Sequence, residues 1–496
     1  MRSRKWFVLL ILLGLLPWVT GCRIEDSPIL RIAHEAELAN VDPMSASDHI
    51  SISILGNFYE GLVDVDRDMK LVPALALSWS TPDDRTWMFT LRPGVSFHDG
   101  SPLTSGDVKF TLDRDRSDPQ SSLQQYLSLI DSIEAQDDST VVIRTKIPDP
   151  MLAYRLTSVF IASRKSSTTI SGRPVGTGPY RFVRFHSGIL DAERFPKYWG
   201  GVPSIARIQF KTIKPGPDTL RVLKTREVDI VRWIPEPLVN SARAVGGFRI
   251  VDRDSLRALY LWMNSQPAKG NPFADRRVRL AIHLAVDRPA LIRSMQNRAI
   301  PIWQLAPPGL IGYYPSMRHP EFSVAASRDL LVQAGYPGGF DTTLTVGPGA
   351  ETLASTISSM LKTAGIRAGV EVLDWPTMKQ KWNAAALPLF IGSWRFTSAE
   401  PSFFLQACLL TPQQAGENGW NPGYSNPQMD SKIRQYLVTF DAEPRRQILR
   451  ELMEAAAEDL PLIPLLQRYD FYGVSEQLEW QPRQDGNLRA NEMRFR

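Results

Sequence analysis

The stretch Ile205-Ala-Arg-Ile-Gln-Phe-Lys-Thr-Ile213 predicts a β-strand that ends before a Pro-Gly turn. A helix is expected next, at residues 218–225, and another strand at residues 229–233. Alternation of strand, helix and strand is typical of α/β units packed on a sheet. The fold class expected from this stretch is therefore α/β.

The same mixture of elements continues on both sides. The expected strands lie at residues 29–33, 87–91, 140–145, 258–264 and 370–373, and the expected helices at 53–65, 107–113, 275–286, 324–334 and 354–364. Asp441 is expected to cap a further helix. No repeat or low-complexity tract interrupts the pattern.

Length and composition narrow the class of protein. A chain of 496 residues exceeds what one hydrophobic core holds, so two or three domains are expected. An apolar content of 43%, with 13 Trp and 21 Phe, excludes a largely disordered chain. Two cysteines exclude a disulfide scaffold or a cysteine-rich metal site.

The first 21 residues resemble a bacterial lipoprotein signal peptide. A basic start (residues 1–5) precedes an apolar run (6–19) too short to span a membrane, and Val19-Thr-Gly-Cys22 follows. Lipidation of Cys22 and a tether at 22–28 are expected, which places the protein outside the cytoplasm on a lipid anchor; an ordinary signal peptide is the alternative. Beyond the leader, 54 positive against 52 negative side chains give no electrostatic case for nucleic-acid binding.

Motifs of covalent chemistry are missing from the sequence. The six histidines are scattered, and neither HExxH, GxSxG nor a Walker loop occurs. Cys408 is expected to be a buried structural thiol. We therefore expect a binding protein rather than an enzyme, with no cofactor and no metal.

Several segments, taken in order, resemble the family 5 extracellular solute-binding proteins of ABC importers. The segments are Asn57-Phe-Tyr-Glu-Gly-Leu-Val63, Trp87 to Gly100, Pro174-Val-Gly-Thr-Gly-Pro-Tyr180, Tyr198-Trp-Gly-Gly-Val-Pro203, Asp275 to Arg288 and Asp459-Leu-Pro-Leu-Ile-Pro464. Each is weak alone, whereas their order behind a lipobox is specific.

The resemblance implies a two-lobed clamp of the large type II periplasmic-binding-protein class. Lobe I would comprise residues 29–261, with an inserted subdomain at about 62–180, and the C-terminal return 466–496. Lobe II would comprise residues 262–465. Two chain crossings would form the hinge, and closure would bury a ligand between the lobes.

The resemblance also implies which residues contact the ligand. Trp394 matches the family tryptophan that packs on the ligand. The residue three positions later, where peptide receptors carry an acid that holds the peptide ammonium, is Thr397. Arg395 is a candidate for recognising a carboxylate or phosphate, unless its side chain points outward.

Two further segments are expected beside the cleft. Glu35 and Glu37 follow the first strand and are candidates for the missing negative charge, although solvated loop acids are the alternative. Gly176 and Tyr180 belong to a Gly-rich turn that either contacts ligand through its backbone or is purely structural.

The function expected from this pattern is capture of a short peptide or peptide-like solute for an ABC permease, by a monomeric lipoprotein of the cell envelope. A receptor for a metal chelate or an anionic sugar- or opine-like solute is an alternative, which Arg395 favours. An exported hydrolase or a structural envelope lipoprotein is an alternative of another class.

Overall fold

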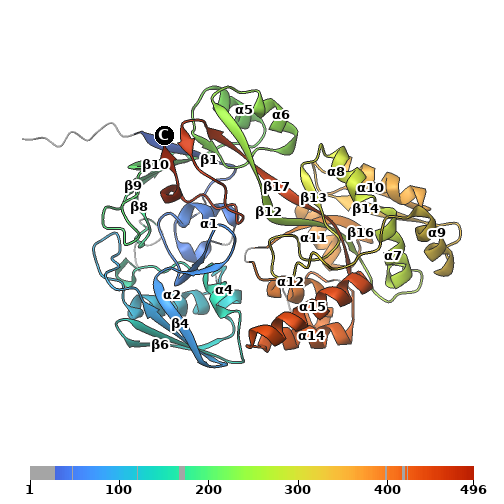
Figure 1. Cartoon of the computed structure of the whole chain (residues 1–496), viewed down its shortest axis with the longest axis horizontal. Helices are drawn as coiled ribbons and strands as arrows, with labels where there is room; N and C mark the ends of the chain where they lie inside the picture. The colour runs from blue at the N-terminus through green and yellow to red at the C-terminus, as the bar shows by residue number, and fades with distance from the viewer. Residues whose placement is uncertain are drawn as a thin grey trace, which may run out of the picture.

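The structure, a computed structural model, describes residues 28–496 apart from 39, 47, 120, 167–171, 173, 397–398, 416–418 and 422. The expected leader, Cys22 and Thr397 therefore lie outside the described residues. Two bodies stand side by side and are joined by two long strands, β12 and β17 (Figure 1). The first body contains residues from both sequence ends of the described chain, and the second contains the segment between the two long strands.

A single mixed sheet runs through both bodies. Its strand order is β15-β14-β16-β12-β17-β11-β1-β10-β9-β8, and β13 pairs with β17 beside this path. In the first body the strands are β1 (Ile29–His34), β8 (Tyr180–His186), β9 (Ile189–Arg194), β10 (Arg207–Thr212) and β11 (Ile230–Val231), and the helices are α1 (His49–Leu55), α5 (Pro217–Lys224) and α6 (Val239–Arg243). Parallel pairing of β1 with both β10 and β11 confirms the α/β unit expected from residues 205–233.

A second, antiparallel sheet is inserted into the first body and lies below the main sheet in Figure 1. Its strands are ordered β4 (Ala76–Asp83), β5 (Thr86–Leu91), β7 (Thr140–Thr145) and β6 (Ile130–Asp137). Helices α2 (Ser105–Ser117), α3 (Gln124–Leu127) and α4 (Leu152–Leu156) accompany it, and two short strands, β2 (Val63–Val65) and β3 (Leu71–Pro73), form a separate ribbon.

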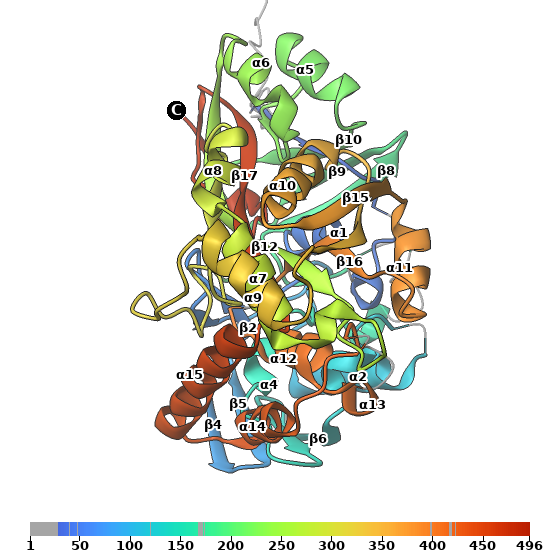
Figure 2. The same cartoon turned by 90° about the vertical axis from the view of Figure 1, so that its right-hand side faces the viewer.

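The second body is built on the other half of the main sheet. Its strands are β13 (Ala299–Pro301), β14 (Phe340–Val346), β15 (Ile366–Val372) and β16 (Leu389–Arg395). Its helices are α7 (Arg276–Ala285), α8 (Arg288–Ser294), α9 (Val324–Gln333), α10 (Glu351–Thr363), α11 (Trp375–Asn383), α12 (Ser402–Leu409), α13 (Pro412–Ala415), α14 (Pro427–Val438) and α15 (Ala442–Asp459). Figure 2 shows this body from the side, with α10 above α7 and α9, and α14 and α15 beneath them.

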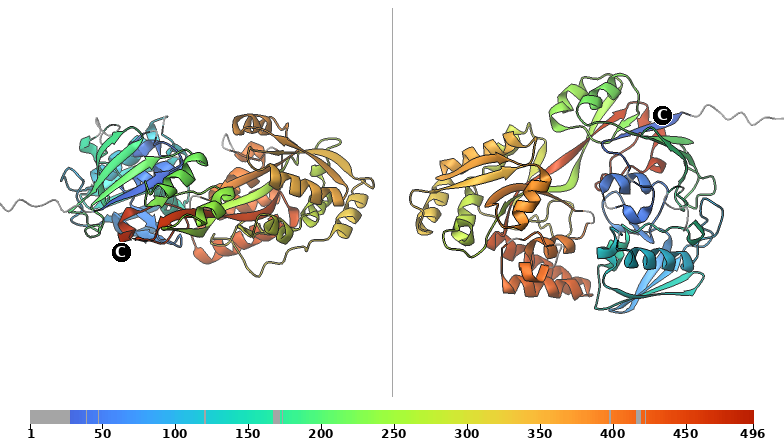
Figure 3. Two further views of the ribbon diagram at one scale, coloured as in Figure 1. Left: turned by 90° about the horizontal axis from the view of Figure 1, so that it is seen from above. Right: turned by 180° about the vertical axis from the view of Figure 1, so that it is seen from behind.

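The crossing strands β12 (Phe248–Met263) and β17 (Leu462–Ser475) pair antiparallel along most of their length. Figure 3 shows them seen from above as the connection between the bodies. Their ladder is irregular between Asp254 and Ala258, where the register with β17 shifts. Strand irregularities of this kind bend a sheet, so the regular ladder that joins the bodies is interrupted here.

Alternation along β12 explains how the second body covers both faces of its sheet. Leu259, Leu261 and Met263 pack with α7 to α10, whereas Tyr260 and Trp262 pack with α11, α12, α14 and α15. Successive side chains of a strand point to opposite faces, so one strand serves two cores.

The core contacts also indicate where the chain passes from one body to the other. Phe248 and Ile250 pack in the first body, whereas Leu256 belongs to a core of the second. On β17, Leu466 packs in the second body and Phe471 in the first. We therefore propose lobe boundaries near residues 254 and 468, close to those expected from the sequence.

One local expectation is wrong in its bounds. Residues 53–65 were expected to be a helix running into a turn, but α1 ends at Leu55 and β2 already begins at Val63. Asp287 lies between α7 and α8 and caps α8, accepting from the Ala290 N–H at 2.9 Å. In the described part of the chain, no helix combines the length and apolar character needed to cross a bilayer.

Candidate functional site

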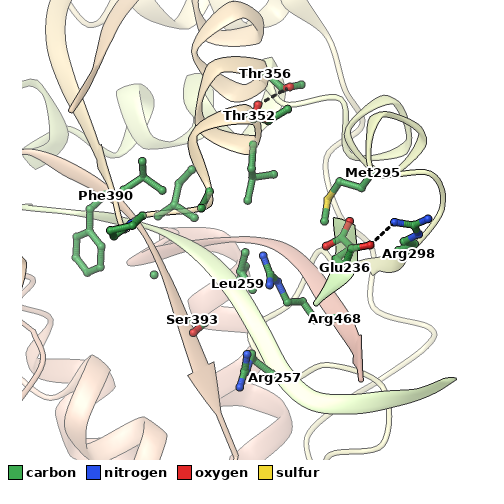
Figure 4. Close-up of a pocket in the computed structure, with 18 of the residues that line it drawn as sticks. Glu236, Arg257, Leu259, Met295, Arg298, Thr352, Thr356, Phe390, Ser393 and Arg468 are labelled. Carbon is green, nitrogen blue, oxygen red and sulfur yellow. Dashed lines mark hydrogen bonds between the residues drawn. The ribbon is translucent and has the colours of Figure 1, made fainter. Parts of the chain in front are cut away.

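A cavity of about 860 Å³ lies where the second body meets the crossing strands (Figure 4). The second body lines it with the β14–α10 loop, β16 and parts of α8 and α11. The first body contributes residues Trp233, Pro235, Glu236 and Pro237, which follow β11. The cavity is thus bounded by both bodies and by the strands that join them.

Tryptophan side chains form one wall of this cavity. Trp394, from β16, meets the Trp420 ring edge-on at 6.5 Å between centroids, and Trp375 stacks on Trp420 at 5.5 Å. Phe403 and Phe404 of α12 hold Trp394 from behind at 5.7 and 5.4 Å. Such a wall offers large apolar area at low conformational cost, which suits the aliphatic or aromatic parts of a ligand.

Charged side chains dominate a smaller cavity of about 230 Å³, which shares Trp233 and Arg257 with the larger one. Two ion pairs lie in it: Arg232 bonds Glu35, and Arg395 bonds Asp470 at 3.1 and 3.3 Å. Nε of Arg232 and Nη1 of Arg395 are buried without a partner among the described residues. The ion pairs are therefore only partly satisfied and leave donors free near the cavity.

Three arginines occupy adjacent positions across three neighbouring strands, and we call them the arginine row. Arg257 of β12 pairs directly with Arg395 of β16. On the other side of β12, Ala258 pairs with Gln467 of β17. Arg257 and Arg468 are the next residues along their strands from this pair. Arg257 and Arg468 both line the larger cavity (Figure 4). Like charges on facing strand positions destabilise a sheet, so this arrangement carries an energetic cost.

Arg257 is a member of the row without a side-chain partner. No described residue forms a hydrogen bond or ion pair with its guanidinium. Burial, followed by repulsion from Arg395, Arg468 and Arg232, lowers the pKa of Arg257 to about 10, against the attraction of Asp470. The group still carries its proton at neutral pH, so a positive charge faces both cavities.

Glu236 is the one acidic residue among the described side chains that line the larger cavity. Burial raises the pKa of its carboxyl, while Arg468 and Arg298 favour the charged form. The Arg298 guanidinium donates to the Glu236 backbone carbonyl and to Asn240, which fixes this corner of the cavity.

The sequence-predicted residues fall into three groups. Trp394 lines the larger cavity and Arg395 the smaller one, together with Glu35. Glu37 is exposed and lines neither cavity. Thr397 lies outside the described residues.

Gly176 and Tyr180 belong to the interior of the first body and line neither cavity. A Cβ atom on Gly176 would lie 2.1 Å from the Phe58 carbonyl oxygen, and one on Gly178 would lie 2.6 Å from the Phe58 carbonyl carbon. The side chain of Tyr180 is fully buried. The packing therefore gives this motif a structural explanation, the alternative that the sequence left open.

Sequence reasoning missed Arg257, Arg468, Trp233, Trp375 and Trp420. Arg257 directly precedes the strand expected at residues 258–264, and Arg468 lies inside the second chain crossing, expected near Leu466–Tyr472; a charged residue inside a buried strand pair was a usable signal. The three tryptophans carried no such signal in the sequence, because a lone aromatic residue in a helix or loop is usually a core residue.

The family model for bacterial extracellular solute-binding proteins, family 5 (middle part), matches residues 70–416. The chain belongs to this family. The family resemblance and the α/β, two-lobed fold expected from the sequence are thereby confirmed.

Individual family 5 relatives agree along most of the chain. The glutathione-binding protein GsiB of Pectobacterium atrosepticum is 29% identical over 453 residues, which cover 87% of each protein. Among solved structures, HbpA2 from Haemophilus parasuis superposes with a TM-score of 0.84 at 20% identity, covering 95% of this chain and 100% of the other. The murein tripeptide-binding protein MppA in its unliganded open form gives 0.82 at 21%, covering 95% and 98%.

Membership of family 5 makes this chain a solute-binding protein, and its relatives are binding proteins. Family members are extracellular or periplasmic. In this context the cavity between the bodies is the candidate solute site.

Proposed function

We propose that this protein is the receptor of an ABC importer, and that it captures a short peptide or peptide-like solute in the cavity between its bodies. The observation that carries the proposal is the joint lining of that cavity by both bodies and the crossing strands. A volume of about 860 Å³ suits a small solute rather than a protein chain. GsiB is named for glutathione and MppA for a murein tripeptide, which favours a peptide.

The cavity offers a partner for each part of a peptide. The tryptophan wall would pack on side chains, and Glu236 would accept from the ammonium group, replacing the acid that the sequence lacks at Thr397. A buried ammonium needs such a charge, because an uncharged hydroxyl does not offset its desolvation. Trp394 contributes through packing, and Arg395 acts through its contact with Asp470.

Binding would proceed by closure of the bodies about the irregular part of β12 and β17, and it would leave the solute chemically unchanged. Only the closed form would present both bodies together to the permease. We further propose that Cys22 carries the lipid anchor, that the body works as a monomer on the outer side of the cytoplasmic membrane or beyond it, and that neither a cofactor nor nucleic acid takes part.

The test is to identify what the protein carries. Protein purified from its own host is denatured, and the small molecules released from it are analysed by mass spectrometry. The expected result is one or a few short peptides in near-stoichiometric amount. Release of non-peptide solutes alone, or recovery of added peptides in a cleaved form, would contradict the proposal.

The arginine row favours a second candidate, an anionic non-peptide solute such as an opine-like acid. The same experiment separates the two, because such a solute has no amino-acid composition after hydrolysis. Cys408, which a hydrolase could use as a nucleophile, is buried in the core, and burial raises the pKa of its thiol.

A further inference from the structure

The charges that line the two cavities do not balance. Arginines 232, 257, 298, 395 and 468 line them, against acidic residues 35, 236 and 470. Glu35 forms an ion pair with Arg232, and Asp470 forms one with Arg395. Of the remaining arginines, Arg298 donates to the Glu236 backbone carbonyl and to Asn240, whereas the guanidinium groups of Arg257 and Arg468 have no hydrogen-bond or ion-pair partner among the described residues.

Arg257 and Arg468 lie on the two strands that join the bodies. Arg395, Arg257 and Arg468 come from β16, β12 and β17, and Arg257 lies within the irregular part of β12. Nε of Arg468 is buried without a hydrogen-bond partner in the described structure. Facing cations with unsatisfied donors need an anion to offset their repulsion, and Asp470, which attracts Arg257, is itself bonded to Arg395.

We propose that Arg257 and Arg468 bind a carboxylate group of the ligand, and that the receptor therefore selects peptides with a free carboxylate at the end that lies against the crossing strands. The inference rests on the proposed peptide-binding function and specifies its substrate class. A carboxylate accepts two parallel N–H donors from a guanidinium, so one such group can bridge neighbouring arginines.

Arg395 completes the subsite as a positioning residue. Its contact with Asp470 at 3.1 Å holds the Arg395 guanidinium and engages Asp470, which attracts Arg257 without forming an ion pair with it. The anion-recognising role expected for Arg395 from the sequence is thus transferred, in this proposal, to its neighbour on β12.

The experiment uses two peptide libraries, random di- to tetrapeptides as free acids and the same peptides with amidated C-termini. The full-length protein is incubated with each library, retained peptides are identified by mass spectrometry, and their affinities are measured by calorimetry. The expected result is at least about tenfold tighter binding of free acids than of the matching amides, as expected for loss of a charge-assisted hydrogen bond.

Variants then assign the effect to the subsite. Arg257→Ala and Arg468→Ala are expected to weaken binding of free acids by about tenfold or more and to change amide binding little, while Arg257→Lys retains part of the preference. Arg253→Ala is the matched control, because Arg253 lies on the same strand and already has Asp68 and Asp254 as partners at 3.1 and 3.3 Å.

The outcomes separate the inference from the function on which it rests. Equal affinity of the unaltered protein for acids and amides would overturn the carboxylate subsite and leave peptide binding intact, even if no variant folds. Retention of nothing from either library would overturn the proposed function itself. A preference for acids that survives in both alanine variants would overturn the assignment to Arg257 and Arg468.

Discussion

Trp394 belongs to the tryptophan wall and lines the larger cavity, the candidate solute site. Replacement by alanine removes the face on which a solute would pack, whereas Phe403 and Phe404 behind it remain in place. We expect Trp394→Ala to weaken ligand binding by more than about tenfold without unfolding the protein. Calorimetry with the identified ligand measures the loss. Trp303→Ala is the control, since Trp303 stacks on His319 outside both cavities.

Asp115 predicts a pH dependence of stability that has nothing to do with ligand. Its carboxyl is buried on α2 with Oδ1 unpartnered, and burial raises its pKa to about 7. Between about pH 4 and pH 7 the folded protein keeps a proton that the unfolded chain loses. The contribution of Asp115 to the free energy of unfolding is therefore complete below about pH 4 and is lost as pH rises through 7.

The variant Asp115→Asn should consequently lose less stability than the unaltered protein between pH 4 and pH 8, with a difference of a few kcal/mol at most. Urea unfolding at the two pH values measures it. Asp113→Asn, on the exposed side of the same helix and paired with Lys109, should retain the full loss. An identical loss in Asp115→Asn would contradict the expected protonation of Asp115.

At the scale of single residues, sequence reasoning located the neighbourhood of the site better than the side chains in it. Trp394 and Arg395 were found because they sit in a segment with a family pattern. The neutralisation of Arg395 could not be foreseen, because Asp470 is 75 positions away and the two meet only across folded strands. Arg257 was missed for the same reason: its importance lies in what its neighbours leave unpaired.

At the scale of the elements, the loop that precedes β8 raises the question whether its glycines are needed for packing or for ligand binding. A methyl group on Gly176 would collide with the Phe58 carbonyl group in the turn that follows α1. This backbone group cannot rotate away as a side chain can. We expect Gly176→Ala to destabilise the protein by about 2 kcal/mol, with unchanged affinity of the folded fraction. Thermal unfolding and calorimetry measure the two quantities.

Gly246→Ala is the matched control for Gly176→Ala, because a Cβ there meets no atom within 4 Å. A weaker affinity of folded Gly176→Ala protein, with normal stability, would instead assign the loop to the ligand site.

Elements with a local signal were predicted well. Asp275 caps α7, accepting from the Arg277 N–H at 2.8 Å, and Asp441 caps α15 as expected; the apolar face of α15, formed by Ile448, Leu449, Leu452, Met453 and Ala456, is buried. The crossing strands were only half recognised, because the first parts of β12 are half-buried and polar. Their strand structure depends on pairing with β17, some 210 residues later in the chain.

At the scale of the whole molecule, the bodies touch at a second place far from the crossing strands. Phe440, which follows α14, packs on the core of the inserted subdomain and lies 5.8 Å from Trp87 between ring centroids. Tyr126 and Phe403 form a similar contact at 6.3 Å. These contacts favour the relative placement of the two bodies in which both of them line the cavity.

We therefore expect Phe440→Ala to shift the population towards an open form and to weaken ligand binding severalfold, although Phe440 lines neither cavity. Small-angle scattering should show a larger radius of gyration without ligand and a normal one at saturation. Val438→Ala, an exposed neighbour, is the control. An unchanged radius and affinity would show that this contact does not bias closure.

The proposed anchor is tested independently of the ligand. Replacing Cys22 by serine removes the thiol that would be acylated, so the protein should move from the membrane fraction to the soluble fraction. Fractionation with immunodetection measures this, and the unaltered protein treated with high salt excludes ionic attachment. Persistence of the variant in membranes would contradict lipidation at Cys22.

Because β12 and β17 run side by side, the chain leaves the first body and returns to it at adjoining points: Asp254 pairs with Tyr469, and Ala258 with Gln467. The whole second body is thus a cassette inserted into one antiparallel hairpin. Its removal would leave two strand ends close enough for a tight turn to join them, and a foreign cassette with the same end spacing could be grafted in its place. The part of the cavity that the second body lines can in this way be exchanged as a block, while Trp233 and Glu236 of the first body stay in place.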